Sequence, residues 1–599
     1  MMIARKIAFA SLASATMALA SAGGVYCQQT SNEAPQTGIV EIKFAAPAAG
    51  RRAGDQAPSP DLARAGVQTA QPVSISLNDA IRRALANNNS IEVSRGDVRF
   101  QATQVEALKG FYDPVFQSTP TYTRTSRTGS TATNDIRLNS GVSGSIKPGG
   151  GDYQFFFNNA RTESAFAQAQ ATSGSVTASS GALYTSALGV QYNQPLLRNF
   201  AIDSTRRNIR IAKKRLEQND ADFRTTAVDT VNQVQRAYWD LVFALRDQQN
   251  QIANVNLARE NLRQAEARID AGAAAPLERA EVATELANRE ASLLLATQQV
   301  SIAENRLKQL VLRDPLSVEW SQSFTPVDAP AVTDEPVSME QAVRDAIQNR
   351  HELKRLRLER EINEVDIRYF KDQLRPQVDL NTTVSLNGLS RGGANNGFVT
   401  NQFTGTNELA LLSGLNRALA ALNQPTVPNP SITIPPQPAF FYGGFDRSLG
   451  NLFRTDAPNF SLGVTISFPF RNRTAKANLA GARVIEEQLA ARTRAQEQAV
   501  IVEVRNAVQA VETARQRVLT ARRARENAEI QLAGEKKLYE AGRSTTFLLF
   551  QRENALTNAR NAEIRSETDY NKAVADLQRA TSTSLTANGV EVDNPVPQQ

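Results

Sequence analysis

Apolar and polar residues alternate along several short segments of the chain. From Phe460 to Phe468 every second residue is apolar, and the residues between them are Ser, Gly or Thr. The segments 377–388 and 187–193 alternate in much the same way. Because successive side chains of a β-strand point to opposite sides, a period of two predicts strands with one apolar and one polar face. Spans of about ten such residues suit outer-membrane barrels, yet alternation alone fits the strands of a soluble sandwich equally well.

Weaker alternation predicts further strands in the first half of the chain, within about 115–195. One lies near 116–124, and an extra hairpin is expected from 136–146 and 153–159, joined by Pro148-Gly149-Gly150-Gly151. In the second half, strands are expected at about 377–388 and 459–470, around a long loop rich in Gly, Asn, Ser, Thr and Pro. Such a loop composition is typical of turns and irregular connections between strands.

Heptad patterns predict two very long helices, at 203–271 and 475–541. In the second, Val500, Val504, Val511 and Val518 follow one another in steps of four and seven, the rhythm of a coiled-coil seam. At ~1.5 Å per residue, each helix is on the order of 100 Å long. A globular core cannot bury such a length, so these helices must pair with other helices.

Each long helix is expected to end at a glycine, Gly272 or Gly542, in the left-handed conformation of a helix C-terminus. Shorter helices then follow at 277–312 and 547–580, the first opened by Pro276 and the second capped by Ser544 or Thr545. Each is about half as long as the helix before it. The lengths therefore predict one continuous helix packed against two stacked shorter helices, twice in the chain.

The chain is internally duplicated. Residues 76–114 realign without a gap on residues 338–376, and the order short helix, strands, long helix, turn, helix recurs in both halves. The repeats are expected at 73–325 and 326–582. A unit of this size that occurs only twice predicts two halves of one pseudo-symmetric body.

The two ends of the chain lack the periodic patterns that predict strands and long helices. Residues 1–22 resemble a secretory signal peptide, with Arg5 and Lys6 before a short apolar run and Ala20-Ser21-Ala22 as the cleavage site. Residues 23–72 and 583–599 are expected to be a flexible extension and a flexible tail. Lipidation of Cys27 is disfavoured by the bulky Tyr26 before it. No later segment approaches ~18 consecutive apolar residues, so no transmembrane helix is expected.

Composition argues against catalysis. Cys27 is the only cysteine and His351 the only histidine, which excludes an intrachain disulfide, Cys/His metal sites and Ser-His chemistry. We interpret His351 as a solvated residue at a helix start, and no catalytic carboxylate pair stands out. The sequence predicts no enzyme, no cofactor and no metal site. The net charge of +7 sits on helix faces without nearby aromatic residues, so nucleic acid is not an expected partner.

Several short motifs resemble those of the TolC family of outer-membrane efflux proteins. They are the duplicated Ser-x-x-x-Ala-x-x-x-Ala openings, the Gln194-Pro195-Leu196-Leu197-Arg198 strand exit, the Tyr539-x-x-Gly542-x-Ser544 turn and Gly272-x-x-x-Pro276-Leu277. No single motif is specific, but their duplicated order is. The resemblance covers the chain from about residue 74 to 582.

The resemblance implies a mainly α fold with β, in which a TolC-like trimeric β-barrel continues into a long α-helical barrel. Four strands from each protomer would close a twelve-stranded barrel in the outer membrane, and four helical columns would form a twelve-helix periplasmic tube. The extra hairpin at 136–159 departs from this pattern and leaves the strand count of the barrel open. The implied function is that of an exit duct in a tripartite efflux or type I secretion system. Its partners would be two further copies of the chain, outer-membrane lipid, a periplasmic adaptor protein and an inner-membrane transporter.

The two helical turns would form the periplasmic entrance of such a duct. The resemblance implies that the entrance and the adaptor contact involve Gly272, Pro276, Leu277, Tyr539, Gly542 and Ser544. Family members often carry acids that narrow the entrance, and the acids near the turns here are Asp270, Glu535 and Glu540. The alternative function is a surface or periplasmic coiled-coil structural or adaptor protein, which explains the heptads but not the alternating strand Phe460–Phe468.

Overall fold

A computed structural model describes residues 64, 67–126, 128, 132–163, 182–272, 275–333, 335–393, 398–403, 405–436 and 438–591. All of them belong to one unit of the chain that begins at Pro60. The expected signal peptide, Cys27 and the end of the expected tail lie outside the described residues. Among the described residues, no helix is both long enough and apolar enough to cross a membrane.

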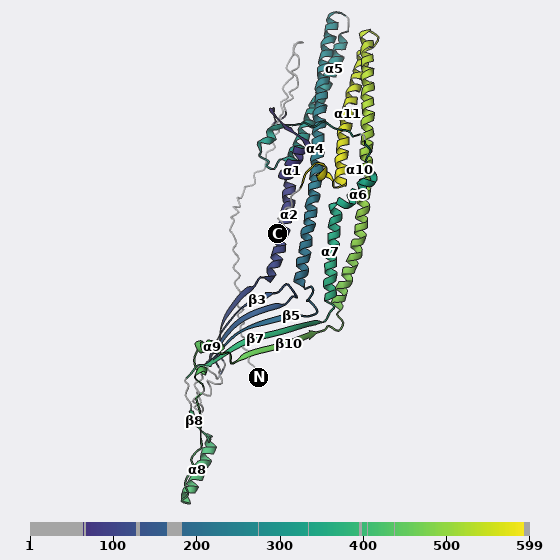
Figure 1. The fold of residues 1–599 in the computed structure, drawn as a ribbon. Coiled ribbons are helices and arrows are strands. Elements are labelled where there is room, and N and C mark those ends of the chain that lie inside the picture. The colour runs from purple at the N-terminus through teal and green to yellow at the C-terminus, as the bar shows by residue number, and fades with distance from the viewer. Residues whose placement is uncertain are drawn as a thin grey trace, which may run out of the picture. The chain divides into compact units, whose positions relative to one another are not determined.

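One antiparallel sheet contains the predicted alternating strands (Figure 1). Its spatial order is β10-β7-β5-β4-β3-β2. The strands are β2 (Val115–Thr125), β3 (Thr133–Ser145), β4 (Asp152–Thr162), β5 (Leu183–Pro195), β7 (Gln377–Arg391) and β10 (Pro458–Ser467).

The sheet has six strands, and the expectation of four strands per protomer is wrong. The hairpin β3–β4 inserts between β2 and β5 and pairs with both along its whole length, from Thr125↔Thr133 on one side to Thr162↔Leu183 on the other. The resemblance supplied the count of four, whereas the residues themselves had indicated the extra hairpin.

Two expectations of flexible segments also need correction. Strand β1 (Gln68–Ile75) begins inside the expected extension because it pairs in parallel with β6 (Gln322–Pro326). Helix α12 (Ser584–Ala587) lies inside the expected tail, where Leu585 and Val590 pack against the main hydrophobic core. Apolar side chains at both ends of the chain thus anchor segments whose composition is otherwise that of loops.

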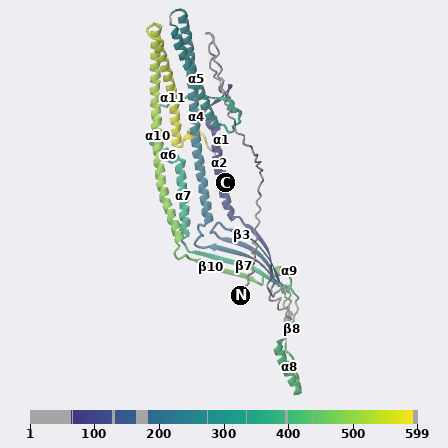
Figure 2. The same cartoon turned by 180° about the vertical axis from the view of Figure 1, so that it is seen from behind.

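The long helices pair as their lengths predict (Figures 1 and 2). Helix α4 (Ser204–Asp270) packs against α2 (Asn89–Lys109) along one half and α5 (Pro276–Val311) along the other. In the second repeat, α10 (Arg473–Glu540) packs against α7 (His351–Asp372) and α11 (Thr546–Ala580). Because α4 also contacts α7 and α11, the four helical columns lie in the order α2/α5, α4, α7/α11, α10.

Short helices brace the middle of these columns. Helices α1 (Leu77–Asn87) and α6 (Met339–Asn349) pack against α4 and α10, respectively, and each is capped by a serine. The Tyr238 hydroxyl of α4 donates to Asp328 Oδ2 at 2.6 Å, and the same oxygen accepts from the backbone N–H of Leu77 at 2.7 Å. Burial and the Asp328 hydrogen bond raise the pKa of Tyr238, so the hydroxyl stays protonated. This hydrogen bond fixes α1 to the continuous helix.

The single histidine is half-buried, so its interpretation as a solvated residue is wrong. His351 opens α7, which packs against α4 and α10. Burial, with smaller contributions from Arg224 and Lys354, lowers the pKa of the imidazole below its ordinary value of 6.5, while Glu352 and Asp220 oppose this. At neutral pH the folded protein therefore holds His351 uncharged.

We expect the free energy of unfolding to decrease as the pH falls below about 6.5, because the unfolded imidazole then binds a proton that the folded one does not. His351→Gln removes this difference, so its melting temperature should fall less between pH ~7.5 and ~5.5. Circular dichroism melting of the detergent-solubilised protein measures both slopes. Identical slopes in the two proteins would show that His351 does not contribute.

Candidate functional site

The sheet has one apolar and one polar face, as the alternation predicts. Residues that pair directly across antiparallel strands lie on the same face, so the register defines rows that cross all six strands. One complete row is apolar, and most of its members are exposed to solvent. It consists of Phe116, Val142, Phe155, Val190, Val384 and Phe460.

The neighbouring row lies on the opposite face and is polar except at its β2 end. Its members are Val115, Ser143, Gln154, Gln191, Thr383 and Ser461. One aromatic residue also lies on this polar face: Phe156 covers Gly189, where an added Cβ would lie 2.5 Å from its ring. A water-soluble sheet would bury its apolar face, but here Phe460 remains 66% exposed. An apolar surface of this extent and regularity is the surface that a strand presents to lipid.

The apolar face has a defined height. In β7 it runs from Val378 to Leu386, a span of nine residues that suits the ~25 Å apolar band of a membrane-spanning strand. Beyond Leu386, helix α9 (Phe445–Leu452) covers the same face, with Ser448 Oγ 2.8 Å from Ser186 Oγ. Only glycine fits at position 388, because a Cβ there would lie 2.0 Å from the Ser448 carbonyl oxygen. The apolar band thus ends at a small polar contact on the side away from the long helices.

The helical turns lie at the other end of the columns (Figure 1). Gly272 and Gly542 follow α4 and α10 and both have φ = +71°, the left-handed conformation predicted for them. Pro276 is the first residue of α5, and Leu277 beside it is 69% exposed. In the second turn Thr545 provides the N-cap, through a 3.3 Å hydrogen bond from the Leu548 N–H.

A polar cluster, which we call the tip clamp, joins the two turns. It consists of Arg268, Glu278, Tyr539 and Thr546. The Arg268 guanidinium hydrogen-bonds the Tyr539 hydroxyl and lies 5.3 Å from the centre of its ring. Glu278 Oε1 accepts from Thr546 Oγ1 at 2.9 Å and from Tyr539 Oη at 3.3 Å, and lies 3.4 Å from Arg268 Nη1. The Arg268–Tyr539 contact is exposed and the contacts of Glu278 are half-buried, and polar contacts of this kind contribute about 1 kcal/mol each.

The three acids that the sequence places near the turns differ in their exposure and in their contacts. Asp270 and Glu540 are exposed at the ends of α4 and α10. Glu535 instead accepts a hydrogen bond from Ser544 and faces Arg552 at 3.9 Å, so it joins α10 to the turn that follows. The structure therefore brings Ser544 and Glu535 together but leaves Asp270 and Glu540 free of ion pairs among the described residues.

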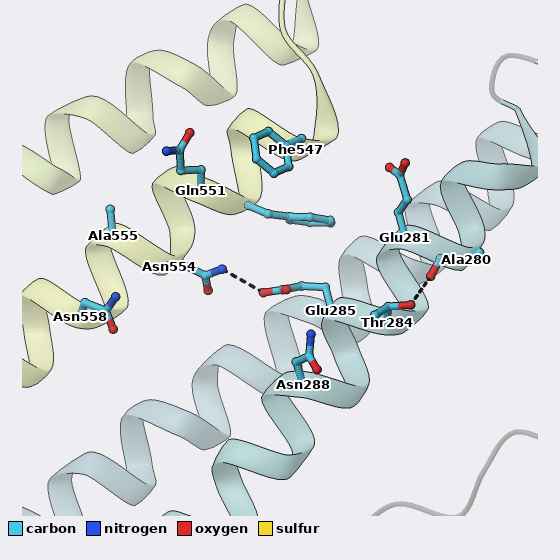
Figure 3. Close-up of a pocket in the computed structure, with 11 residues that line it drawn as sticks. Ala280, Glu281, Thr284, Glu285, Asn288, Phe547, Gln551, Asn554, Ala555 and Asn558 are labelled. Carbon is cyan, nitrogen blue, oxygen red and sulfur yellow. Dashed lines mark hydrogen bonds between the residues drawn. The ribbon is translucent and has the colours of Figure 1, made fainter.

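A groove lies between α5 and α11, just behind the turns (Figure 3). Its volume is about 840 Å³. The Asn554 amide reaches across it to Glu285 Oε1 at 3.1 Å, and Phe547 points into it from the first turn of α11. The remaining lining side chains are mostly short or amide-bearing: Ala280, Thr284, Asn288, Gln551, Ala555 and Asn558. Aromatic groups within a polar frame are a surface to which another helix can dock.

A buried ion pair lies next to this groove. Arg289 of α5 donates to Glu553 of α11 at 2.9 Å, and the two side chains are only 7% and 6% exposed. Asn261 of α4 donates to both oxygens of Glu553 at 3.2 Å, and Glu285 accepts from Arg289 at 2.8 Å. Removing one partner of such a pair typically costs about 3–5 kcal/mol, because the other charge is left buried and unpaired. This pair fixes the two helical hairpins to each other.

Of the residues in the tip clamp and the buried ion pair, the sequence singles out only Tyr539. Arg268, Glu278, Arg289 and Glu553 each occupy an ordinary position on a charged helix. Their partners lie 261 to 271 residues away, across the two repeats. Only the near-constant offset of the duplication indicated that residues so far apart would meet.

Comparison with known proteins agrees with this architecture. The sequence matches the family described as "Outer membrane efflux protein" over residues 80–311 and 440–583, more than half of the chain. Among solved structures, the outer-membrane channel OprN superposes with a TM-score of 0.56 at 16% identity, covering 88% of this chain and 98% of that chain. The Campylobacter jejuni outer-membrane channel CmeC gives 0.54 at 13% identity, covering 85% and 86%.

The open state of the Neisseria gonorrhoeae outer-membrane channel MtrE gives a TM-score of 0.52 at 14% identity, covering 89% of this chain and 98% of that chain. No curated protein matches the sequence. The two-faced sheet and the paired helical columns therefore define the fold of an outer-membrane channel.

The chain belongs to the outer membrane efflux protein family. This confirms the resemblance to TolC-like proteins and the mainly α fold with β. It also confirms the location in the outer membrane, with helices that extend into the periplasm. The protein is a transport channel and not an enzyme.

Proposed function

We propose that three copies of this chain form the outer-membrane exit duct of a tripartite efflux or type I secretion system, through which substrates pass passively from the periplasm to the exterior. The observation that carries this proposal is the exposed apolar face of the sheet, backed by a polar face on its other side. Lipid would cover the first face and water would fill the space behind the second.

Closure into a ring follows from the two unpaired edges of the sheet. In hydrocarbon each unsatisfied backbone group costs several kcal/mol, so β2 and β10 must find partners. An even number of antiparallel strands makes these two edges run in opposite directions, which lets the last strand of one copy pair with the first strand of the next. The two repeats, 73–325 and 326–582, would then give a trimer six similar units around one axis.

Opening of the entrance would consist of breaking the tip clamp. Its contacts hold the two turns of each protomer together, and they are few and at most half-buried. Loss of about 1–2 kcal/mol of clamp energy changes the ratio of open to closed tips by five- to thirty-fold. A partner that binds the turns more tightly when they are apart would therefore open the duct.

The partner proposed for the turns is a helical periplasmic adaptor that links the duct to an inner-membrane transporter. The groove between α5 and α11 gives this adaptor a docking surface, next to Pro276, Leu277 and the turn residues Gly272, Tyr539, Gly542 and Ser544. The transporter would supply the energy of export. No nucleic acid takes part in this proposal.

Reconstitution tests the duct itself. The purified protein should migrate as a trimer by native mass measurement, partition into outer-membrane fractions and give stepwise single-channel currents in planar bilayers. A structural coiled-coil protein would give no current. Monomers without channel activity in bilayers would overturn the proposal.

Weakening the tip clamp should raise the conductance of the duct. Arg268→Ala combined with Tyr539→Phe removes the Arg268–Tyr539 and Tyr539–Glu278 hydrogen bonds and leaves only the Thr546–Glu278 bond of the clamp between the turns, so single-channel currents should be severalfold larger and open events more frequent. The matched control is Asp270→Ala with Glu540→Ala, which removes two exposed acids that have no clamp contact.

These acid substitutions should leave the current level unchanged and weaken only its block by added divalent cations. If the clamp variant conducts like the wild type, the clamp does not hold the entrance closed. If cation block is unchanged in the control, Asp270 and Glu540 do not line the entrance.

Docking at the turns predicts that Gly542→Trp abolishes export in cells. The left-handed φ of Gly542 strains any other residue, and the indole would project from the exposed turn. Gly534→Trp is the control, because Gly534 lies on α10 with open space around it and outside the turn. Trimers should persist in both variants. Normal export by the Gly542→Trp variant would refute the docking role.

A further inference from the structure

The wall of helices and the sheet follow the same order around each protomer. Helix α2 leads into β2, β5 leads into α4, α7 leads into β7, and β10 leads into α10. The columns α2, α4, α7 and α10 neighbour one another in that sequence, and so do the strands β2, β5, β7 and β10 once the hairpin β3–β4 is set aside. The hairpin is therefore additional sheet, placed above the α2–α4 pair, with no helices of its own.

Estimated widths show what the hairpin does. Neighbouring helices lie ~8–10 Å apart, so four columns occupy an arc of ~32–40 Å. Strands ~4.8 Å apart and tilted by ~35–45° give an arc of ~34–42 Å for six strands, but only ~23–28 Å for four. With six strands the sheet is as wide as the helical wall beneath it. With four strands it would be about one third narrower.

We propose that the β3–β4 hairpin widens the membrane part of the duct until its backbone ring matches the ring of helix axes beneath it, in an eighteen-stranded ring where β10 of each copy pairs with β2 of the next copy. This inference rests on the proposed function as an outer-membrane duct. It corrects the twelve-stranded ring implied by the family resemblance, since each of three copies contributes six strands.

Both edges are suited to pair with a second copy. Every residue of β10 is exposed, and none of them is charged. Strand β2 is exposed from Val115 to Arg124, and Arg124 at its far end is its only charge. Soluble proteins protect long sheet edges with charges or bulges, but neither edge has a bulge and Arg124 is the only charge on the two strands. Pro120 removes one donor from β2, which leaves the rest of the ladder intact.

The apolar row continues across such a seam. Phe116 is the β2 member of the row and Phe460 is its β10 member, so pairing of the two edges joins apolar face to apolar face around the ring. The polar faces join in the same way, through Gln117 and Thr119 on one side and Ser461 and Thr465 on the other. At the level of this row every strand of the ring then presents an apolar side chain outward, and polar side chains predominate on the inner face.

The consequence concerns cargo size. Three arcs of ~34–42 Å enclose a ring ~32–40 Å across between backbones, whereas three four-stranded arcs give ~22–27 Å. The membrane region then imposes no narrower limit than the helical tube, and the helical turns alone select by size. The substrates fitted to this duct are large hydrated solutes that a four-stranded arc would exclude.

Polymer exclusion in planar bilayers tests the width. Polyethylene glycols of graded size are added from the sheet side or from the helix side, and the largest polymer that lowers the current is recorded for each side. Deletion of residues 133–162, which removes β3 and β4 and leaves their flanking loops, should lower the limit on the sheet side by about one third and leave the limit on the helix side unchanged. An unchanged sheet-side limit would overturn the inference.

Cysteine cross-linking tests the seam in the full-length chain, so the inference stays testable if the deletion does not fold. In a Cys27→Ser background, Thr119→Cys or Thr121→Cys is combined with Ser461→Cys or Thr465→Cys. At least one pair should form a disulfide between copies and give covalent dimers and trimers on non-reducing gels. Asn139→Cys is the control, because Asn139 pairs with Thr119 but lies on the interior strand β3.

The outcomes separate the two proposals. Cross-linked trimers with the expected polymer limits support both the duct and its eighteen-stranded ring. Absence of cross-links from all four pairs, in a protein that still conducts, refutes the seam and leaves the duct standing. Absence of any current in the wild type refutes the duct itself.

Discussion

Backbone hydrogen bonding at the edges of the sheet is the constraint on which the rest of this molecule depends. A sheet with one lipid-facing side cannot leave the N–H and C=O groups of β2 and β10 unpaired in hydrocarbon. The apolar rows make the sheet suitable for a membrane, and the open edges then require further copies of the chain. Oligomerisation is thus a condition for inserting the sheet at all.

In the proposed duct the helices extend the ring of strands into water by different means. Small and β-branched residues such as Val504 and Ala514 form the seam of α10, and they allow close approach of the neighbouring columns. The columns alternate between continuous helices and stacked shorter ones, so the breaks in one column are bridged by its neighbour. Ion pairs between columns, such as Arg522 with Glu567 at 2.8 Å, add modest stabilisation at the wet surface.

Local periodicity made much of the architecture predictable. Alternation predicts strand β10 and heptads predict helix α10, and each pattern lies within a single segment. Gly272 and Gly542 predict where the long helices α4 and α10 end. The contacts that join the repeats did not follow. Arg268 with Tyr539 and Arg289 with Glu553 pair across more than 260 residues, and no local pattern distinguishes them from other helix charges. The strand count stayed open for another reason: the family resemblance implied four strands, while the alternation that predicts the hairpin β3–β4 is too weak to decide between four and six.

The buried pair Arg289–Glu553 has a mechanical consequence. It lies eleven residues beyond Gly542, ~16 Å along the helix, and it is more deeply buried than the contacts at the turns. In the proposed duct, opening would tilt each hairpin end about this pair, and a tilt of ~20° would move a turn sideways by ~6 Å. The position of the ion pair along the helix would then set how far the entrance can open.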